Sequence, residues 1–409
     1  MGDAKNYGSL FNCAFVVSLL LPFAFIVRQD IAVSGIGIEK LVFVTVMVIW
    51  IGSIAQRRSI RVPNMYHMAA ILLIFWNLSS ILWTTSTSKT VAILPNSFVI
   101  LVVVLMIWDL YRTATQMNIA ASSYSATSFI FSILIFRNYV LGIAYGPGRY
   151  TALGVNPNVI ALPLLLSIPI SWRLIQRRYF TGYFSIFTKL QLLIVPAAVI
   201  LTGSRQGLIG LILVFSYPVW SLISERTTSI PSWKVLVPTV ITGIVFLMES
   251  RDVLDRFLTI PTAVLSGDFG SRGVQWIAGW TLFQDSMVVG IGANTFNTAI
   301  EPLIGYQVAP DNTYLLVLYE LGIIGIIFLF SLLAILFYID QRNGNSVYNS
   351  WTAILVTWCV IGLVNDLIWV PLYWYLFTWL VADRSGNQGV STWNLSVSEW
   401  LLSRQHITD

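Results

Sequence analysis

The chain has 409 residues, of which 56% are hydrophobic and only 10% are charged. Because a soluble protein carries about 25% charged residues, this composition leaves too little polar surface to keep a soluble core dissolved. It excludes a soluble enzyme, a secreted disulfide scaffold and a disordered chain, and it leaves a membrane protein with many spans. The net charge of +5 does not indicate nucleic-acid binding, because the basic residues are scattered at the ends of apolar runs.

Apolar runs of about 20 residues, long enough to cross a bilayer, recur along the chain. They predict an all-α, polytopic fold with about twelve transmembrane helices, in one transmembrane domain over residues 1–383 that a polar tail follows at 384–409. The expected spans are residues 10–27, 38–55, 67–84, 91–108, 118–136, 157–172, 188–203, 207–224, 234–248, 313–339, 351–369 and 371–383.

Basic residues set the expected orientation of these spans. With the amino terminus in the cytoplasm, the clusters QRRSIR (56–61) and QRR (176–178) both lie on the inner side, as the positive-inside rule requires. Both termini are then expected to be cytoplasmic.

Two segments on the expected outer side are longer than a connection needs, residues 137–156 and the hydrophilic stretch 249–311. Within the larger one, residues 271–286 carry Arg272 and Trp276 on a pattern of helical spacing, which predicts an amphipathic helix on the membrane surface. Interfacial anchoring is the simpler interpretation of its tryptophans.

Arginine is concentrated on the same side, between residues 137 and 272. The guanidinium fork matches phosphate geometry, so this concentration suggests an anionic ligand. Arg251 and Arg256 could instead pair with acidic neighbours. Arg205 lies in the turn TGSRQG between two apolar runs, where a charge indicates function unless the side chain snorkels to water. Arg272 starts the expected surface helix, whose first amides could help it to bind an anion.

Carboxylates and amides complete the candidate set. Asp311, in PDNTYL, could take a proton from a sugar hydroxyl or cap the following span. Asn156 and Asn158, in GVNPN, could be donors to a ligand or part of a capped turn. Glu320 and Asp366 are expected inside spans, where they could relay protons or pair with an arginine.

The order and spacing of these motifs resemble the O-antigen ligase superfamily, polytopic enzymes that include O-antigen ligases, O-antigen polymerases and exopolysaccharide polymerases. The resemblance runs from about Arg149 to Trp379. It rests on the motifs GVNPN, TGSRQG, SRGVQW, GIGANTF and DNTYLLVLYELGIIG.

The resemblance implies metal-independent glycosyl transfer without a cofactor, on the periplasmic face of the bacterial inner membrane. The donor would be a glycan on undecaprenyl pyrophosphate, and the lipid pyrophosphate would leave when an acceptor hydroxyl attacks the anomeric carbon. The implied catalytic residues are Arg205, Arg272 and Asp311. Further substrate contacts are expected from Arg149, Asn156, Asn158, Asn312, Trp276 and Tyr314. A chain-length regulator and a flippase of the same pathway are expected partners, together with membrane lipid, whereas nucleic acid is not.

One departure from the family pattern bears on the activity. Ligases of the superfamily carry a histidine where this sequence has Asp311, and neither His67 nor His406 can replace it, because both are expected on the inner side. This favours a polymerase, with an O-antigen ligase that transfers the glycan to lipid A-core as the alternative. A transporter or flippase also fits twelve spans, but it would need charges near the midplane rather than at one face. A structural membrane protein would leave the outer arginines unexplained.

Overall fold

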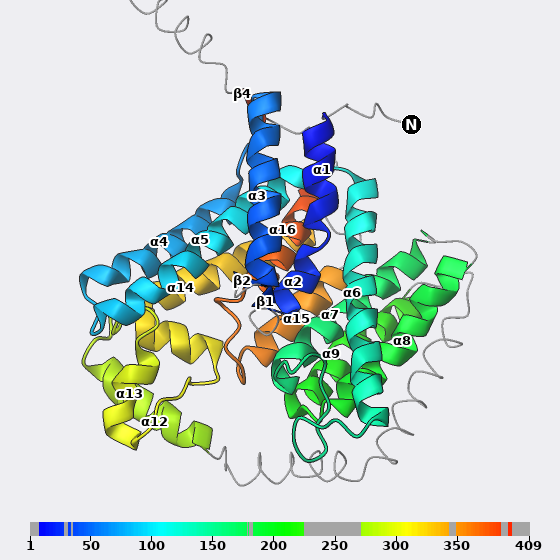
Figure 1. The fold of residues 1–409 in the computed structure, drawn as a ribbon. Helices are drawn as coiled ribbons and strands as arrows, with labels where there is room; N and C mark the ends of the chain where they lie inside the picture. Colours follow the sequence, from blue (N-terminus) through cyan, green and yellow to red (C-terminus); the bar gives the residue numbers. More distant parts are fainter. Residues whose placement is uncertain are drawn as a thin grey trace, which may run out of the picture.

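The computed structural model describes residues 8–27, 32–33, 36–177, 179, 183–224, 271–342, 349–385 and 392–394, and most of them are helical (Figure 1). The helices are α1 (Ser9–Ser18), α2 (Leu21–Val27), α3 (Ile38–Arg57), α4 (Met65–Ser79), η2 (Ser80–Leu82), α5 (Thr87–Leu110), α6 (Ala114–Val140), α7 (Pro157–Gln176), α8 (Tyr183–Leu201), α9 (Arg205–Ser224), α12 (Ser271–Gln284), α13 (Phe296–Ile304), α14 (Thr313–Arg342), α15 (Ser350–Ile361) and α16 (Pro371–Ser385). Two short antiparallel pairs join β1 (Ala32–Val33) to β2 (Ile36–Gly37) and β3 (Ser59–Arg61) to β4 (Thr392–Asn394).

Eight helical segments of the described chain are long and apolar enough to cross a membrane, which confirms the all-α, multi-pass class. The expected number of twelve is not confirmed. The expected span at 234–248 and residues 249–270 of the hydrophilic stretch, with Arg251 and Arg256, lie outside the described residues.

The expected span at 351–369 is wrong in its second half. Helix α15 ends at Ile361, and residues 362–370 form a non-helical connection to α16. Asp366 therefore lies in a connection rather than inside a span. The connection packs against the start of α14. There, Thr313 N donates hydrogen bonds to the carbonyl oxygens of Gly362 and Asn365.

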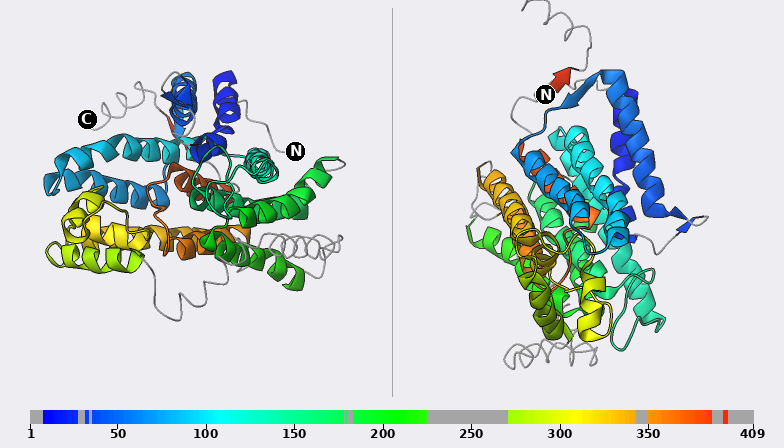
Figure 2. Two further views of the ribbon diagram at one scale, coloured as in Figure 1. Left: turned by 60° about the horizontal axis from the view of Figure 1, so that its bottom comes forward. Right: turned by 90° about the vertical axis from the view of Figure 1, so that its left-hand side faces the viewer.

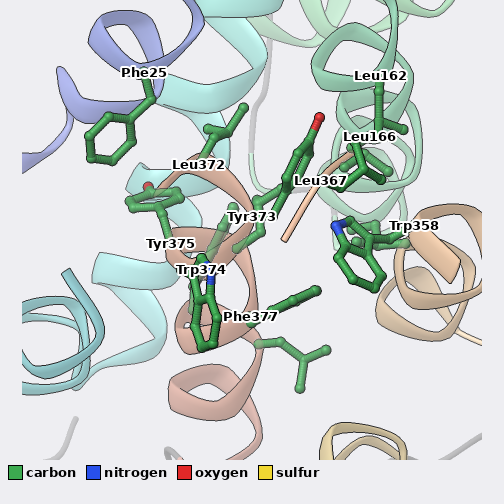
Figure 3. Packing of buried hydrophobic residues seen from close by; sticks show 14 of the residues in the cluster. Phe25, Leu162, Leu166, Trp358, Leu367, Leu372, Tyr373, Trp374, Tyr375 and Phe377 are labelled. Carbon is green, nitrogen blue, oxygen red and sulfur yellow. The ribbon is translucent and has the colours of Figure 1, made fainter. Parts of the chain in front are cut away.

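Helix α16 lies at the centre of the packing. Nearly every residue of its stretch 371–382 is buried, and it packs against α5, α14 and α2. Figure 3 shows its aromatic side chains between Phe25 of α2 on one side and Leu162 and Trp358, of α7 and α15, on the other. Its buried surface on all sides identifies α16 as a core helix that neighbouring helices surround.

Several of the segments expected on the cytoplasmic side meet at one end of the molecule. There, arginines pair with three aspartates: Arg57 and Arg112 with Asp109, Arg173 with Asp383, and Arg384 with Asp340. The pairing of β4 with β3 brings residues 392–394 to the same end, beside the end of α3 (Figure 2). A buried charge needs such partners, so these arginines hold helix ends together.

At the opposite end, α14 is broken at Gly322, whose φ of 69° and ψ of −166° are not helical. The connection between α12 and α13 supplies partners for the groups that the break leaves open. Ile291 N and Gly292 N donate to the carbonyl oxygens of Tyr319 and Glu320, at 3.0 and 2.9 Å, and Ile323 N donates to the carbonyl oxygen of Met287 at 2.9 Å. Irregular backbone at membrane depth is tolerated only where protein groups satisfy it in this way.

The substitution Gly322→Ala tests this connection. A Cβ atom at Gly322 would lie 2.2 Å from the carbonyl oxygen of Val288 and would also have to adopt a positive φ. We expect a loss of stability beyond the 1–3 kcal/mol or so of backbone strain alone, read as a lowered melting temperature of the purified protein in detergent. Gly142→Ala is the matched control, because Gly142 has a φ of 68° but no atom within 4 Å of the place that a Cβ would take. If the two variants lose equal stability, the close contact between residue 322 and the Val288 carbonyl oxygen is not the cause of the loss.

Candidate active site

The turn TGSRQG presents Arg205 at the start of α9. Gly203 adopts a φ of 59°, and a Cβ atom there would lie 2.5 Å from the carbonyl oxygen of Gly148, so the turn packs directly on the segment that carries Arg149. The Ser204 hydroxyl accepts a hydrogen bond from Gly207 N at 3.2 Å and caps the helix. The Arg205 side chain is exposed, and no hydrogen bond or ion pair to another described residue holds it.

The amides of GVNPN lie against the same turn. The Asn156 side chain accepts a hydrogen bond from Asn158 N at 2.9 Å and caps α7, as its alternative interpretation predicts. The Arg149 guanidinium donates to Asn158 Oδ1 at 2.9 Å, and Gln206 Nε2 donates to the Asn158 carbonyl oxygen at 2.9 Å. Arg149, Asn156, Asn158 and Arg205 are therefore brought together from three separate segments of the sequence.

Arg272 and Asp311 form a second group. Helix α12 begins at Ser271, as expected, and places Arg272 in its first turn. Arg272 Nε lies 3.3 Å from Asp311 Oδ2, and both side chains keep substantial exposure, 31% and 44%. Trp276 Nε1 donates to the Pro310 carbonyl oxygen at 2.8 Å, so the tryptophan fastens α12 to the segment that carries Asp311.

The expectation that Asp311 could cap the following helix is wrong. Asn312 is the capping residue, since its side-chain oxygen accepts hydrogen bonds from Tyr314 N and Leu315 N, both at 3.0 Å. Asp311 instead has a φ of 44°, a left-handed conformation that a short polar side chain tolerates. This geometry turns its carboxylate toward Arg272 and leaves capping to its neighbour.

Two expected substrate-binding side chains are engaged elsewhere. Asn312 Nδ2 donates to the Leu363 carbonyl oxygen at 2.9 Å, which fastens α14 to the connection after α15. The Tyr314 hydroxyl donates to the Cys359 carbonyl oxygen at 2.8 Å, and its ring stacks on Phe330. Both residues thus have structural partners away from the Arg272–Asp311 pair.

A cavity of about 530 Å³ has one lining residue in the first group and one close in sequence to the second. Asn156 lines it from the first group, and Ala309, two residues before Asp311, lines it from the second. The remaining polar or aromatic lining residues are Glu39, Asn96, Asn294, Asn297, Glu320, Asp366 and Trp369. Sequence reasoning did not assign this cavity, although Asn294 and Asn297 stand in the motif GIGANTF and Glu320 and Asp366 were singled out as acids.

The partner of Glu320 is backbone rather than arginine. Its carboxylate accepts hydrogen bonds from Asn294 N at 2.8 Å and from Phe296 N at 3.1 Å, and so holds the start of α13. The side chain is buried at the break in α14. Glu320 therefore joins the broken helix to the loop that lines the cavity.

Comparison with known protein families gives a match, and it covers the part of the chain that carries Arg205, Arg272 and Asp311. Residues 190–330 match the family model described as O-antigen ligase. The match covers about a third of the chain and supports a place in the superfamily of O-antigen ligases and polymerases. A search of curated proteins found no match.

The stretch that matches the family model contains most of the candidate residues. Arg205, Arg272 and Asp311 all lie within 190–330, as do the break at Gly322 and Glu320. Arg149, Asn156 and Asn158 lie before it and reach the site through the fold. Within the described ranges, no three histidine, cysteine, aspartate or glutamate side chains gather in a metal-ligand group.

Proposed function

We propose that this protein is a membrane glycosyltransferase that polymerises oligosaccharide repeat units, carried on undecaprenyl pyrophosphate, into a surface polysaccharide such as an O-antigen or an exopolysaccharide. The observation that carries the proposal is the Arg272–Asp311 pair, which puts a phosphate-binding cation beside an accessible carboxylate. The family match supports a membrane enzyme that acts on a lipid-linked glycan. We place this end of the molecule in the periplasm of a bacterial inner membrane, with both termini in the cytoplasm.

The arginines would act on the leaving group. In the proposed step, an acceptor hydroxyl attacks the anomeric carbon of the donor glycan, the bond from that carbon to the pyrophosphate oxygen breaks, and the lipid pyrophosphate leaves with the electron pair. Arg205 and Arg272 would stabilise the charge that develops on it. Arg205 suits this role because its side chain is exposed at a helix start whose backbone a tight turn holds in place. The proposed step uses no metal ion.

Asp311 is the proposed general base, and it would take the proton of the attacking hydroxyl. Capping does not explain this residue, because Asn312 already caps α14. Its exposure of 44% leaves the carboxylate accessible to a substrate. An ionised carboxylate has the free lone pairs that such a proton acceptor needs.

The polymerase assignment rests on Asp311, where ligases that the sequence resembles carry a histidine. The description of the matching family favours a second candidate, an O-antigen ligase that transfers the glycan to lipid A-core.

The surface polysaccharide of a host that lacks this gene distinguishes the two activities. We expect single repeat units only, because repeats that are not polymerised are still made and exported. Long chains that remain on the lipid carrier would instead identify the ligase. An unchanged profile, in a host without a redundant gene, would contradict both.

Substitution of the two arginines tests the leaving-group role. Arg205→Ala and Arg272→Ala should each reduce polymer formation by about 10²–10³-fold, the effect of removing one transition-state donor. Arg→Lys at either position should also be damaging, since a point charge does not reproduce the fork. Arg342→Ala, in an exposed residue at the far end of α14, is the matched control. Full activity of both alanine variants, at wild-type protein levels in the membrane, would contradict the proposal.

The substitution Asp311→Asn tests the base. Asparagine tolerates the left-handed backbone and keeps an oxygen toward Arg272, so the fold should persist while transfer falls by about 10²–10⁴-fold. Asp311→His should retain part of the activity, because it restores a base. Polymer length and amount, measured by gel electrophoresis of extracted polysaccharide, give the readout. Wild-type activity of Asp311→Asn would contradict the general-base role and leave Asp311 only as the ion-pair partner of Arg272.

A further inference from the structure

The cavity that Asn156 and Ala309 line has the size of a small-molecule site, and half of its lining residues are polar. Its volume of about 530 Å³ falls within the usual range of ligand cavities, about 300–1,000 Å³. Four asparagines contribute to its wall: Asn96, Asn156, Asn294 and Asn297. Seven of the fourteen lining residues are polar and seven are apolar. The cavity therefore suits a ligand that combines many hydroxyl groups with a carbon skeleton, as a sugar does.

The asparagines offer both donors and acceptors. Asn96 Nδ2 donates to the Trp369 carbonyl oxygen at 2.8 Å, so the amide nitrogen is engaged while the side-chain oxygen is an acceptor. Asn156 Oδ1 accepts from Asn158 N at 2.9 Å, while its amide nitrogen is a donor. Asn297 is exposed in the first turn of α13, and no hydrogen bond to another described residue holds its side chain. Hydroxyl groups, which donate and accept together, match this mixed wall.

The charges in the wall are all of one sign. Glu39 and Asp366 carry these charges, and among the described residues that line the cavity none is lysine or arginine. Glu320 also lines it, but its buried carboxyl group already accepts hydrogen bonds from two backbone amides. Asp366 reaches it from the connection between α15 and α16, three residues before the aromatic ring of Trp369. A phosphate, a pyrophosphate or an acidic sugar would face these carboxylates, and like charges brought together cost binding energy. The anionic part of a donor therefore belongs with the arginines and not in this cavity.

We infer that this cavity is the acceptor subsite and that it takes an uncharged sugar, with selection against uronic acids by Asp366 and Glu39. The asparagines bond the sugar hydroxyls, and Trp369 offers an aromatic surface to the face of the ring. The cavity reaches Ala309, two residues from Asp311, which places the attacking hydroxyl at the rim where the proposed base lies. This inference rests on the proposed function, and it adds the class of sugar that the enzyme accepts.

Binding of matched methyl glycosides to the full-length protein in detergent tests the subsite without any transfer reaction. The probes are methyl glucoside against methyl glucuronide, and methyl galactoside against methyl galacturonide, measured by saturation-transfer NMR. We expect at least one neutral glycoside to bind, and its uronate partner to bind about tenfold more weakly because of the facing carboxylates. Absence of binding by either neutral probe, or equal binding within each pair, would overturn the inference.

Two variants with matched controls locate the effect. Asp366→Asn, which is isosteric, should raise uronate binding and leave the neutral glycoside bound. Asp285→Asn removes the same charge at an exposed position outside the cavity and should change nothing. Asn297→Ala should weaken the neutral glycoside, whereas Asn118→Ala, beside Arg177 at the other end of the molecule, should not. If Asp366→Asn leaves the ratio of neutral-glycoside binding to uronate binding unchanged, the proposed role of this carboxylate is wrong.

The two proposals can fail separately. If the neutral glycosides bind with the expected selectivity but the gene deletion leaves the polysaccharide unchanged, the proposed transferase activity fails and the sugar site stands. If deletion leaves single repeats but the selectivity is absent, the acceptor subsite fails and the transferase activity stands.

Discussion

The constraint on which this structure depends is that backbone amide and carbonyl groups within a membrane protein must find partners inside the protein. Helix α14 is not helical at Gly322, so its regular backbone hydrogen bonds are interrupted there. The loop between α12 and α13 forms hydrogen bonds with backbone groups on both sides of this break. Trp76 adds one more, from its indole nitrogen to the Leu321 carbonyl oxygen at 2.9 Å. The loop cannot leave without exposing several unpaired groups, so it belongs to the rigid part of the molecule.

The features of the candidate site follow from that attachment. The break places Glu320 against the start of α13, where its carboxylate takes two backbone amides. Trp83 and Thr85, before α5, bond the carbonyl oxygens of Val289 and Ile291 and so hold the loop from the other side. Consequently the cavity wall is built from elements that are far apart in the chain but are joined by backbone contacts, a rigid support of the kind that a binding site needs.

The arginines at the two ends of the molecule differ in their exposure and in their ion pairs. At the end with β3 and β4, Asp109 and Asp340 form ion pairs with Arg57, Arg112 and Arg384, so these three arginines have structural partners. At the opposite end, Arg205 and Arg272 remain exposed or half-exposed. The carboxylates of the cavity and the two arginines give this end regions of opposite charge, which is the division that the proposed acceptor sugar and anionic leaving group require.

The sequence alone determined the membrane class, the helix that begins at Ser271, the cap of Asn156 and the turn that exposes Arg205, because apolar runs, capping residues and glycine turns act over a few neighbouring residues. It misplaced the cap at Asp311 by one residue and put Asp366 in a span, since two adjacent polar residues cap equally well on paper and an apolar run does not reveal where a helix stops. The Arg272–Asp311 pair, the repaired break at Gly322 and the carboxylate-lined cavity were decided only by tertiary structure. Each joins segments separated by tens to hundreds of residues, and local sequence preferences carry no information on which distant segment will satisfy a given charge or backbone group.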